Sequence, residues 1–354
     1  MKPIPLTHVW QYTDVDRAFW DERLADWLPE RIIDAHVHVL NPALCLEPMT
    51  DEKRRQHWVA EVAEPLEAEV LCRCDRVVFP GRDVSHVAFG WPDPAFDVEA
   101  ANEYARRESL QRGWHALALL RPQWSAERVA AELDKPGVIG VKPYYAMIGS
   151  DLKTRDRYIE AGIFEFLPHH ALEVLNDRRA WVTLHVPKAD RLGHPDNLRE
   201  IREIRRRYPD VVLMIAHFGR CYTESHAREG LLPLADDAGI YFDNSAVLNP
   251  VVHRIALETF GPGRIIYGTD NPVLYMRGRR QWHDRTYVNR TNVDFHFNTD
   301  RESPEIEAGY TLYMYEALAA ICQACEQAGI GRDGVEAIFA GNAQRLIDSV
   351  GPDR

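Results

Sequence analysis

The amino-acid sequence predicts an α/β fold, a (β/α)8 TIM barrel, and three observations lead to that prediction. Short apolar runs rich in β-branched residues alternate with stretches of helical periodicity. The chain holds eight such runs, the number that closes a parallel barrel, and 354 residues suffice for one barrel with insertions. The first run is not followed by a glycine-rich phosphate-binding turn, which disfavours an open doubly wound sheet.

We expect the eight strands to start at residues 32, 76, 114, 138, 181, 211, 240 and 264. The second strand would be brief, residues 76–79, and a loop would follow at 80–96. Helices are expected at 51–70, 97–112, 125–133, 164–176, 196–207, 224–235, 250–260, 311–327 and 334–348. Ser125 would cap its helix, because a serine hydroxyl can accept a bond from a free backbone N–H of the first turn.

Two segments lie outside this regular pattern. Residues 1–30 are expected to form an N-terminal helical extension, since 14–28 carry apolar residues at amphipathic helical spacing. Residues 31–350 would then form the barrel. Within it, 271–309 show no clear periodicity, and a stretch of this length after the eighth strand is typical of a lid or binding loop.

Composition excludes several classes of function. A net charge of −12 disfavours nucleic-acid binding, which needs a basic face. No run approaches the twenty apolar residues of a membrane span. Six cysteines in so long a chain do not form a disulfide framework, so we expect a cytoplasmic protein with free thiols. The tryptophan-bearing helix at 14–28 could pack across a homodimer interface.

The end of the first strand carries a candidate metal site. Residues 31–40 read Arg-Ile-Ile-Asp-Ala-His-Val-His-Val-Leu. Because alternate side chains of a strand point to one face, His36 and His38 share a face, with Asp34 behind them. A pair of hydrogen-bonded core histidines would explain this pattern alone. Three further groups favour a metal, because His185, His217 and Asp270 also follow strand-like runs.

Every one of these groups would lie at the same mouth of the barrel. Active sites of parallel barrels are built at the carboxyl ends of the strands, and Lys142 ends the fourth strand in the same way. Histidine and aspartate suit zinc, and manganese, iron or cobalt fit the same donors. The sequence therefore predicts one divalent metal ion, zinc in the first place.

The motifs Asp-Ala-His-Val-His, Thr-Leu-His, Ile-Ala-His-Phe-Gly and Tyr-Gly-Thr-Asp-Asn-Pro occur in this order. With them the chain resembles the amidohydrolase superfamily, and within it the amidohydrolase-related branch of aminocarboxymuconate-semialdehyde decarboxylase. The resemblance extends over about residues 32–346. It implies a mononuclear centre held by His36, His38, His185 and Asp270, with His217 beside it as a catalytic or supporting residue.

The chemistry of these residues agrees with that implication. A carboxylate at a metal can carry a proton, so Asp270 is the expected acid and base, and His217 could orient substrate or stabilise charge on an oxygen. Lys142 has two interpretations. In binuclear relatives a lysine after the fourth strand is carboxylated and bridges two metals, whereas we expect an uncarboxylated Lys142 that contacts substrate.

Several strand-end groups are expected to contact a small substrate, and their positive charge suits a carboxylate. The expected substrate-binding residues are Lys142, Tyr144, Tyr145, Lys188, Arg220, Asn244 and Arg277. Arg121, Arg279 and Arg280 belong to the same basic group of residues.

Three functions remain open at this point. The first is metal-dependent hydrolysis of a small, anionic amide, ester or lactone by activated water. The second is non-oxidative decarboxylation of an aromatic or unsaturated acid, in which Asp270 would protonate carbon. The third is a non-catalytic barrel that only binds metal. We favour hydrolysis because it needs the fewest assumptions about substrate.

Overall fold

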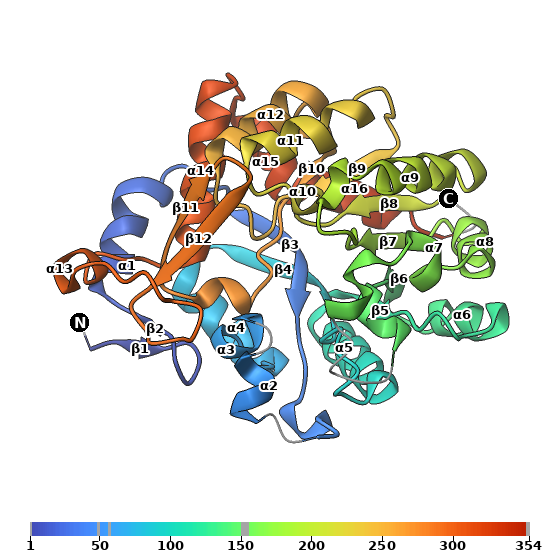
Figure 1. Ribbon diagram of the computed structural model, residues 1–354, viewed down its shortest axis with the longest axis horizontal. Helices are drawn as coiled ribbons and strands as arrows, with labels where there is room; N and C mark the ends of the chain where they lie inside the picture. Colours follow the sequence, from blue (N-terminus) through green and yellow to red (C-terminus); the bar gives the residue numbers. More distant parts are fainter. Residues whose placement is uncertain (1, 48–49, 56–57, 150–155, 352–354) are drawn as a thin grey trace.

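A sheet of eight parallel strands forms the centre of the protein, seen in a computed structural model that describes residues 2–47, 50–55, 58–149 and 156–351 (Figure 1). The strands pair in chain order, which is the (β/α)8 barrel predicted from sequence. They are β3 (Arg31–His38), β4 (Asp83–Phe89), β5 (His115–Leu119), β6 (Val138–Lys142), β7 (Trp181–Leu184), β8 (Val212–Ile215), β9 (Ile240–Asp243) and β10 (Ile265–Ile266).

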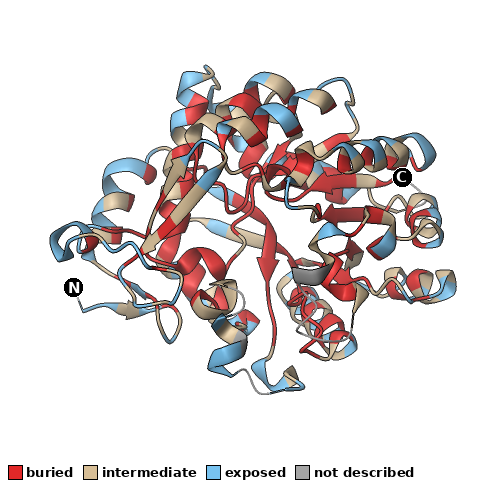
Figure 2. Cartoon of the chain, in the orientation of Figure 1, coloured by how far each residue is buried: buried red, intermediate tan, exposed pale blue. Residues whose placement is uncertain are grey.

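Helices surround the sheet and present their polar faces outward, so the strands are buried while the outer helix surfaces are exposed (Figure 2). The longer ones are α4 (Ala68–Val78), α5 (Val98–Arg112), α6 (Ala126–Leu133), α8 (His169–Asp177), α9 (Pro195–Arg207), α12 (Pro250–Phe260), α14 (Tyr313–Gln327) and α16 (Asn342–Ser349). The shorter ones are α1 (Asp14–Phe19), α2 (Asp51–Arg55), α3 (Trp58–Val62), α7 (Ile163–Phe166), α10 (His217–Arg220), α11 (Glu224–Gly230), α13 (Pro304–Glu307) and α15 (Arg332–Glu336). Among the described residues, no helix combines the length and apolar character needed to cross a bilayer.

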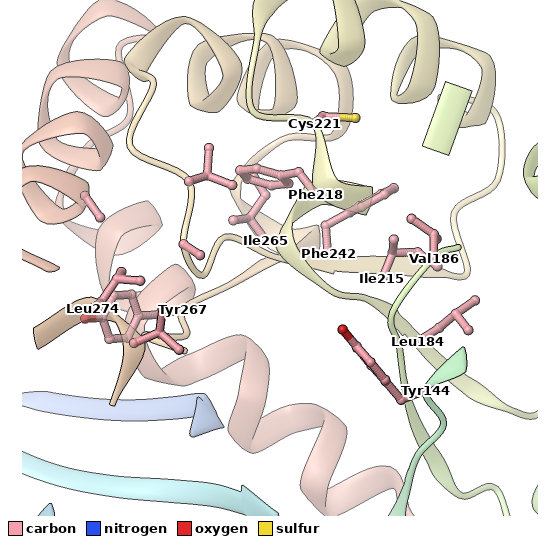
Figure 3. Close-up of a cluster of buried hydrophobic side chains, with 14 of the residues drawn as sticks. Tyr144, Leu184, Val186, Ile215, Phe218, Cys221, Phe242, Ile265, Tyr267 and Leu274 are labelled. Carbon is pink, nitrogen blue, oxygen red and sulfur yellow. The ribbon is translucent and has the colours of Figure 1, made fainter. Parts of the chain in front are cut away.

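Clusters of buried apolar side chains hold the barrel together, and two of them define its inner and outer faces. Phe218, Phe242 and Ile265 belong to the layer between sheet and helices (Figure 3). A second cluster contains side chains from several barrel strands, including fully buried Trp181, together with Leu346 of α16. Helix α16 therefore packs against one end of the barrel, and the polar strand ends gather at the other.

Backbone hydrogen bonds join the first strand to the chain that follows the last one. Ala35 N donates to Tyr267 O at 2.9 Å, Asp270 N to His36 O at 2.8 Å, and His38 N to Asn271 O at 2.9 Å. We call this contact between residues 35–38 and 267–271 the closure seam. It brings His36 and Asp270 side by side, although they are 234 residues apart in the chain.

The predicted strand at 76–79 is wrong. Leu71, Cys74 and Val78 recur at helical spacing on the buried face of α4, and this burial outweighs the β-branched run at its end. The second strand is β4, within the predicted loop 80–96, where Ser85 and His86 interrupt the apolar pattern. The helix predicted over 51–70 is divided by Pro65, and residues 56–57 lie outside the described residues.

The irregular stretch predicted over 271–309 contains an antiparallel hairpin, β11 (Gly278–His283) and β12 (Thr286–Thr291). In Figure 1 it is the orange pair of strands beside α14. Its strands are rich in arginine, glutamine and asparagine, so hydrophobic alternation did not reveal them.

A buried ion pair ties the N-terminal segment to this region. Asp16, in α1, is fully buried and pairs with Arg277, and it also accepts from Thr311 Oγ1 at 2.8 Å. The guanidinium of Arg277 is bound further by the carbonyls of Tyr310 and Gln11. Arg277 therefore anchors the N-terminal segment.

Replacing Asp16 by alanine would leave the Arg277 guanidinium buried without its carboxylate. We expect Asp16→Ala to lower the free energy of unfolding by about 3 kcal/mol, measured by urea denaturation. Asp21→Ala removes an exposed carboxylate from the next turn and serves as the control. Equal losses in the two variants would refute the anchoring role.

A second buried charge cluster lies behind the closure seam. His86 Nε2 bonds the carboxylate of Asp75 at 2.9 Å, and its Nδ1 lies 3.7 Å from that of Asp34. Asp34 in turn accepts from Thr269 N and Oγ1, at 2.9 and 2.6 Å. Burial lowers the pKa of His86, but the two carboxylates outweigh burial and raise it to about 9.

This raised pKa makes stability depend on pH. Because the pKa of His86 exceeds its ordinary value of 6.5, its contribution is complete below pH 6.5 and disappears as pH rises through about 9. We expect a loss of about 3 kcal/mol of unfolding free energy across that range. His86→Gln should flatten this pH dependence in denaturant titrations, and an unchanged slope would contradict the assignment.

Candidate metal centre

Three predicted metal ligands meet at the closure seam. The Asp270 carboxylate oxygen Oδ1 lies 3.2 Å from His38 Nε2 and 3.5 Å from His36 Nε2. The two histidines come from the end of β3, and Asp270 follows β10. Candidate ligand atoms of all three residues lie within 4.8 Å of one another.

The other nitrogen of each imidazole is held by the protein. His36 Nδ1 lies 2.9 Å from Asp243 Oδ2, and His38 Nδ1 lies 3.0 Å from the carbonyl oxygen of Gly90. A carboxylate or carbonyl at Nδ1 fixes the tautomer in which Nδ1 carries the proton, and Nε2 then presents its lone pair. Both histidines are therefore oriented as ligands through Nε2.

The remaining predicted groups surround this cluster. The His217 ring lies 4.6 Å from that of His36 and 5.3 Å from that of His185, measured between centroids. Its Nδ1 is fixed by the carbonyl and hydroxyl oxygens of Ser245, at 3.1 and 2.8 Å. His185 is not part of the three-residue cluster, but its buried Nδ1 has no hydrogen-bond partner among the described residues.

Asp243 is a site residue that sequence reasoning missed. Its carboxylate accepts from His217 N at 2.8 Å, from Ser245 N at 3.1 Å and from His36 Nδ1 at 2.9 Å. Burial raises its pKa, but the adjacent His36 outweighs burial and holds the pKa well below the usual range. Asp243 ends its strand as the other site residues do, so the strand-end rule could have found it. The side-chain oxygen of Asn244, the neighbour chosen instead, accepts from Gly268 N at 3.3 Å.

The charge states at the centre suit a cation. Burial lowers the pKa of His36 to about 4, and it also lowers the pKa of His185 and of His217, so all three rings are neutral near pH 7. Burial raises the pKa of Asp270, but His217 and the bond to His38 outweigh burial and hold it at about 2. The centre therefore offers neutral imidazoles and an ionised carboxylate, the forms that bind metals.

Lys142 lies at the same centre. Its Nζ is 3.2 Å from His36 Nε2 and 5.0 Å from the centre of the Phe89 ring. Burial lowers its pKa to about 8, so a neutral amine is accessible near physiological pH. Both interpretations of Lys142, carboxylated bridge and substrate contact, require this position.

A cavity opens from the centre between the strand ends and the loops. Its described lining includes the metal cluster, predicted substrate contacts and residues that were not predicted. The lining comprises His36, His38, Trp58, Val59, Trp91, Pro92, Lys142, Tyr144, Tyr145, His185, His217, Arg220, Tyr222, Ala246, Asp270, Val273, Leu274, Arg280, Tyr287 and Tyr313. Asp270 is the one carboxylate among these residues, whereas three of them are cationic.

Three predicted substrate contacts lie outside this lining. Lys188 Nζ donates to the carbonyl of Glu160 at 2.6 Å. Asn244 is buried beneath the centre, and Arg277 is the anchor of the N-terminal segment. Each of these side chains makes other contacts in the structure, and substrate binding by these three residues stays a prediction. Arg280, three residues beyond Arg277, occupies the cavity instead.

Several cavity residues have strained backbones. His217, Arg220, Ala246 and Asp270 all adopt positive φ, between 54° and 64°. Such conformations are disfavoured for residues with a Cβ and concentrate at functional sites. At Gly219, between His217 and Arg220, a Cβ would lie 2.5 Å from Leu192, so this turn tolerates glycine alone.

Comparison with known proteins settles the family. A family model described as Amidohydrolase matches residues 33–348. The chain belongs to the amidohydrolase family. No curated protein matches this amidohydrolase.

Solved structures share its architecture. An amidohydrolase from Burkholderia multivorans with bound zinc has a TM-score of 0.57 at 13% identity, over 90% of this chain and 99% of that one. 4-Oxalomesaconate hydratase, LigJ, from Rhodopseudomonas palustris has a TM-score of 0.53 at 13% identity, over 90% and 96%. 5-Carboxyvanillate decarboxylase, LigW, from Sphingomonas paucimobilis has a TM-score of 0.50 at 14% identity, over 90% and 99%. At these identities the likeness establishes the fold.

The donor set of this amidohydrolase fits a divalent cation. Tetrahedral ligands bound about 2.1 Å from zinc lie about 3.4 Å apart, and the carboxylate oxygen of Asp270 is 3.5 and 3.2 Å from the two imidazole nitrogens. The unpartnered Nδ1 of His185 is a buried polar atom that a metal or substrate would satisfy.

Gly268 permits the close approach at the closure seam. A Cβ at this position would lie 2.7 Å from the Cβ of His36, too close to tolerate. We expect Gly268→Ala to displace His36 and weaken zinc affinity by about tenfold or more, measured by competition with a chelating dye. Gly263→Ala, where a Cβ meets no atom within 4 Å, is the control. Undiminished affinity in Gly268→Ala would show that this contact does not position the ligand.

Proposed function

We propose that this amidohydrolase is a metal-dependent hydrolase of a small, anionic ester, amide or lactone. The observation that carries the proposal is the position of Asp270. It is the one carboxylate on the described cavity lining, and its Oδ1 lies between two imidazoles that are oriented to bind metal. One group is thus available to hold a cation and to move a proton.

His36, His38 and Asp270 would hold the cation, with His185 as the fourth ligand. A bound divalent cation lowers the pKa of water and polarises a substrate oxygen. Asp270 accepts the proton of the attacking water and returns it to the leaving group. His217, whose Nδ1–H is bound by the carbonyl of Ser245, presents the lone pair of Nε2 and can accept a hydrogen bond that orients the substrate or the attacking water.

The cavity favours an anionic substrate. Lys142, Arg220 and Arg280 face one carboxylate across the described lining, although the chain as a whole carries a charge of −12. Tyr144 and Tyr145, whose rings stack at 4.5 Å, supply two hydroxyl groups. These groups can orient a carboxylate or a neighbouring oxygen of the substrate.

Decarboxylation of an aromatic acid is the second candidate, and the aromatic lining favours it. Trp91, Tyr222, Tyr287 and Tyr313 present rings against which a flat substrate can stack. In that reaction Asp270 would take a proton from water or from a hydroxyl group of the substrate and deliver it to the ring carbon, and the carbon–carboxylate bond would break to release carbon dioxide. The two reactions use the same donors, so a product analysis is needed to separate them.

That product analysis uses water labelled with oxygen-18. We expect carboxylate-bearing aryl esters and lactones to yield labelled acid, with the rate reduced by about a thousandfold or more in Asp270→Asn. Aromatic carboxylic acids are incubated in parallel, and released carbon dioxide is measured. Asp270-dependent carbon dioxide release without label incorporation would establish the decarboxylase. Turnover of neither set by the metal-loaded protein would contradict hydrolysis of these substrates and favour the non-catalytic metal-binding barrel.

Metal removal tests the cofactor separately. We expect dialysis against a chelator to abolish activity and one equivalent of zinc per chain to restore it, followed by elemental analysis and by assay. Two tightly bound ions per chain would instead indicate a carboxylated Lys142 that bridges them, as in binuclear amidohydrolases. Manganese, iron and cobalt are tested in the same reconstitution.

A further inference from the structure

The guanidinium of Arg280 is a buried charge without a carboxylate. Arg280 lies on β11, is 5% exposed and lines the cavity of the metal centre. Within the described part of the chain, no carboxylate oxygen lies within 4.0 Å of it. Its Nε donates to Asn289 Oδ1 and its Nη1 to the carbonyl of Ala246, each at 2.9 Å. Its Nη2 has no acceptor among the same residues.

Tyrosine rings surround this guanidinium. Its carbon Cζ lies 4.5 Å from the ring centre of Tyr287, 5.2 Å from that of Tyr222 and 5.8 Å from that of Tyr313. Cation–π contacts offset part of the cost of burying the charge, but they give the N–H groups of Nη2 no acceptor. Buried charges in proteins are otherwise paired, so this arrangement is incomplete without an anion.

Two consecutive residues of one loop fix the positions of Arg280 and of His217 relative to each other. The carbonyl of Ser245 fixes His217, and the carbonyl of the next residue, Ala246, fixes Arg280. Ala246 adopts a φ of 57°, which is strained for a residue with a Cβ, and the surrounding structure holds its carbonyl in this position. A second guanidinium, that of Arg220, lines the same cavity and bonds only the backbone carbonyls of Val186 and Lys188 among the described residues.

We infer that Arg280, assisted by Arg220, binds a planar oxyanion of the substrate, a carboxylate separate from the bond that reacts at Asp270. The inference rests on the proposed function and deepens it. A fixed, planar fork with a free Nη2 suits bidentate recognition of a carboxylate. The substrate class is then a small, flat acid that packs against the tyrosine rings of the cavity lining and carries its reacting group toward the metal ligands.

The test is a calorimetric titration of the zinc-loaded protein with isophthalate, a flat ring bearing two carboxylates. Isophthalamide is the neutral probe of the same shape, and phenyl phosphate distinguishes a phosphate site from a carboxylate site. We expect isophthalate to bind and isophthalamide to bind at least tenfold more weakly. Tighter binding of phenyl phosphate than of isophthalate would overturn the assignment to a carboxylate.

Substitutions locate the binding on Arg280. We expect Arg280→Gln to weaken isophthalate binding by about tenfold or more and Arg280→Lys, which keeps the charge but loses the fork, by a smaller factor. Arg279→Gln is the matched control, because Arg279 is the adjacent residue of β11, pairs with Glu302 and is 42% exposed in its side chain. The affinity of Arg279→Gln for isophthalate should stay within twofold of that of the wild type.

Two measurements check that a loss of binding does not come from misfolding or from loss of zinc. Circular dichroism and zinc content verify that each variant is folded and loaded, and Arg280→Lys carries the test if Arg280→Gln does not fold. Isophthalate affinity unchanged in a folded Arg280 variant would overturn the inference. Because binding is measured without turnover, Arg280-dependent binding in a protein that hydrolyses no ester would refute the proposed function and leave the inference standing.

Discussion

Everything at the candidate centre depends on the closure seam between the first strand and the chain after the last one. Three backbone hydrogen bonds align residues 35–38 with 267–271, and they set Asp270 against His36 and His38. Gly268 lets the two segments approach, and Asp34 binds Thr269 from behind. A barrel that closed with a different register would carry the same residues without a metal site.

Around the seam, each side chain is fixed by a partner that does not itself face the substrate. Asp243 binds the Nδ1 atom of His36 and the backbone N–H of His217, so one buried carboxylate orients two imidazoles. Gly90 supplies a carbonyl to His38 in the same way. Such partners determine which nitrogen is free, and therefore which chemistry a histidine can perform.

Much of this could be predicted from sequence, for physical reasons that differ by residue. The barrel followed from the alternation of buried strands and amphipathic helices, and His36, His38 and Asp270 from the rule that barrel sites lie at strand ends. This rule identifies which strand contributes a site residue, but it does not fix the exact position at the strand end. It therefore selected Asn244 and missed the adjacent Asp243. The apolar run at 76–79 was predicted as the second strand, but these residues belong to or follow helix α4, whose buried face includes Leu71, Cys74 and Val78.

The outer part of the cavity could not be predicted, because it belongs to a hairpin with little hydrophobic alternation. Arg277 and Arg280 lie three residues apart, yet one is bound by Asp16 and the other lies against tyrosine rings in the cavity. Only the turn and pairing of β11 and β12 decide which arginine faces the metal centre. Sequence indicated the basic character of this segment but not the register that gives it a role.

One metal ion is expected to join residues from the end of the first barrel strand and from the chain that follows the last one. The most direct measurement is a crystal structure of the zinc-loaded protein with anomalous diffraction collected at the zinc edge. We expect one strong anomalous peak about 2.1 Å from Nε2 of His36, Nε2 of His38 and a carboxylate oxygen of Asp270. A peak bound elsewhere on the chain, or density without zinc between these three side chains, would contradict it.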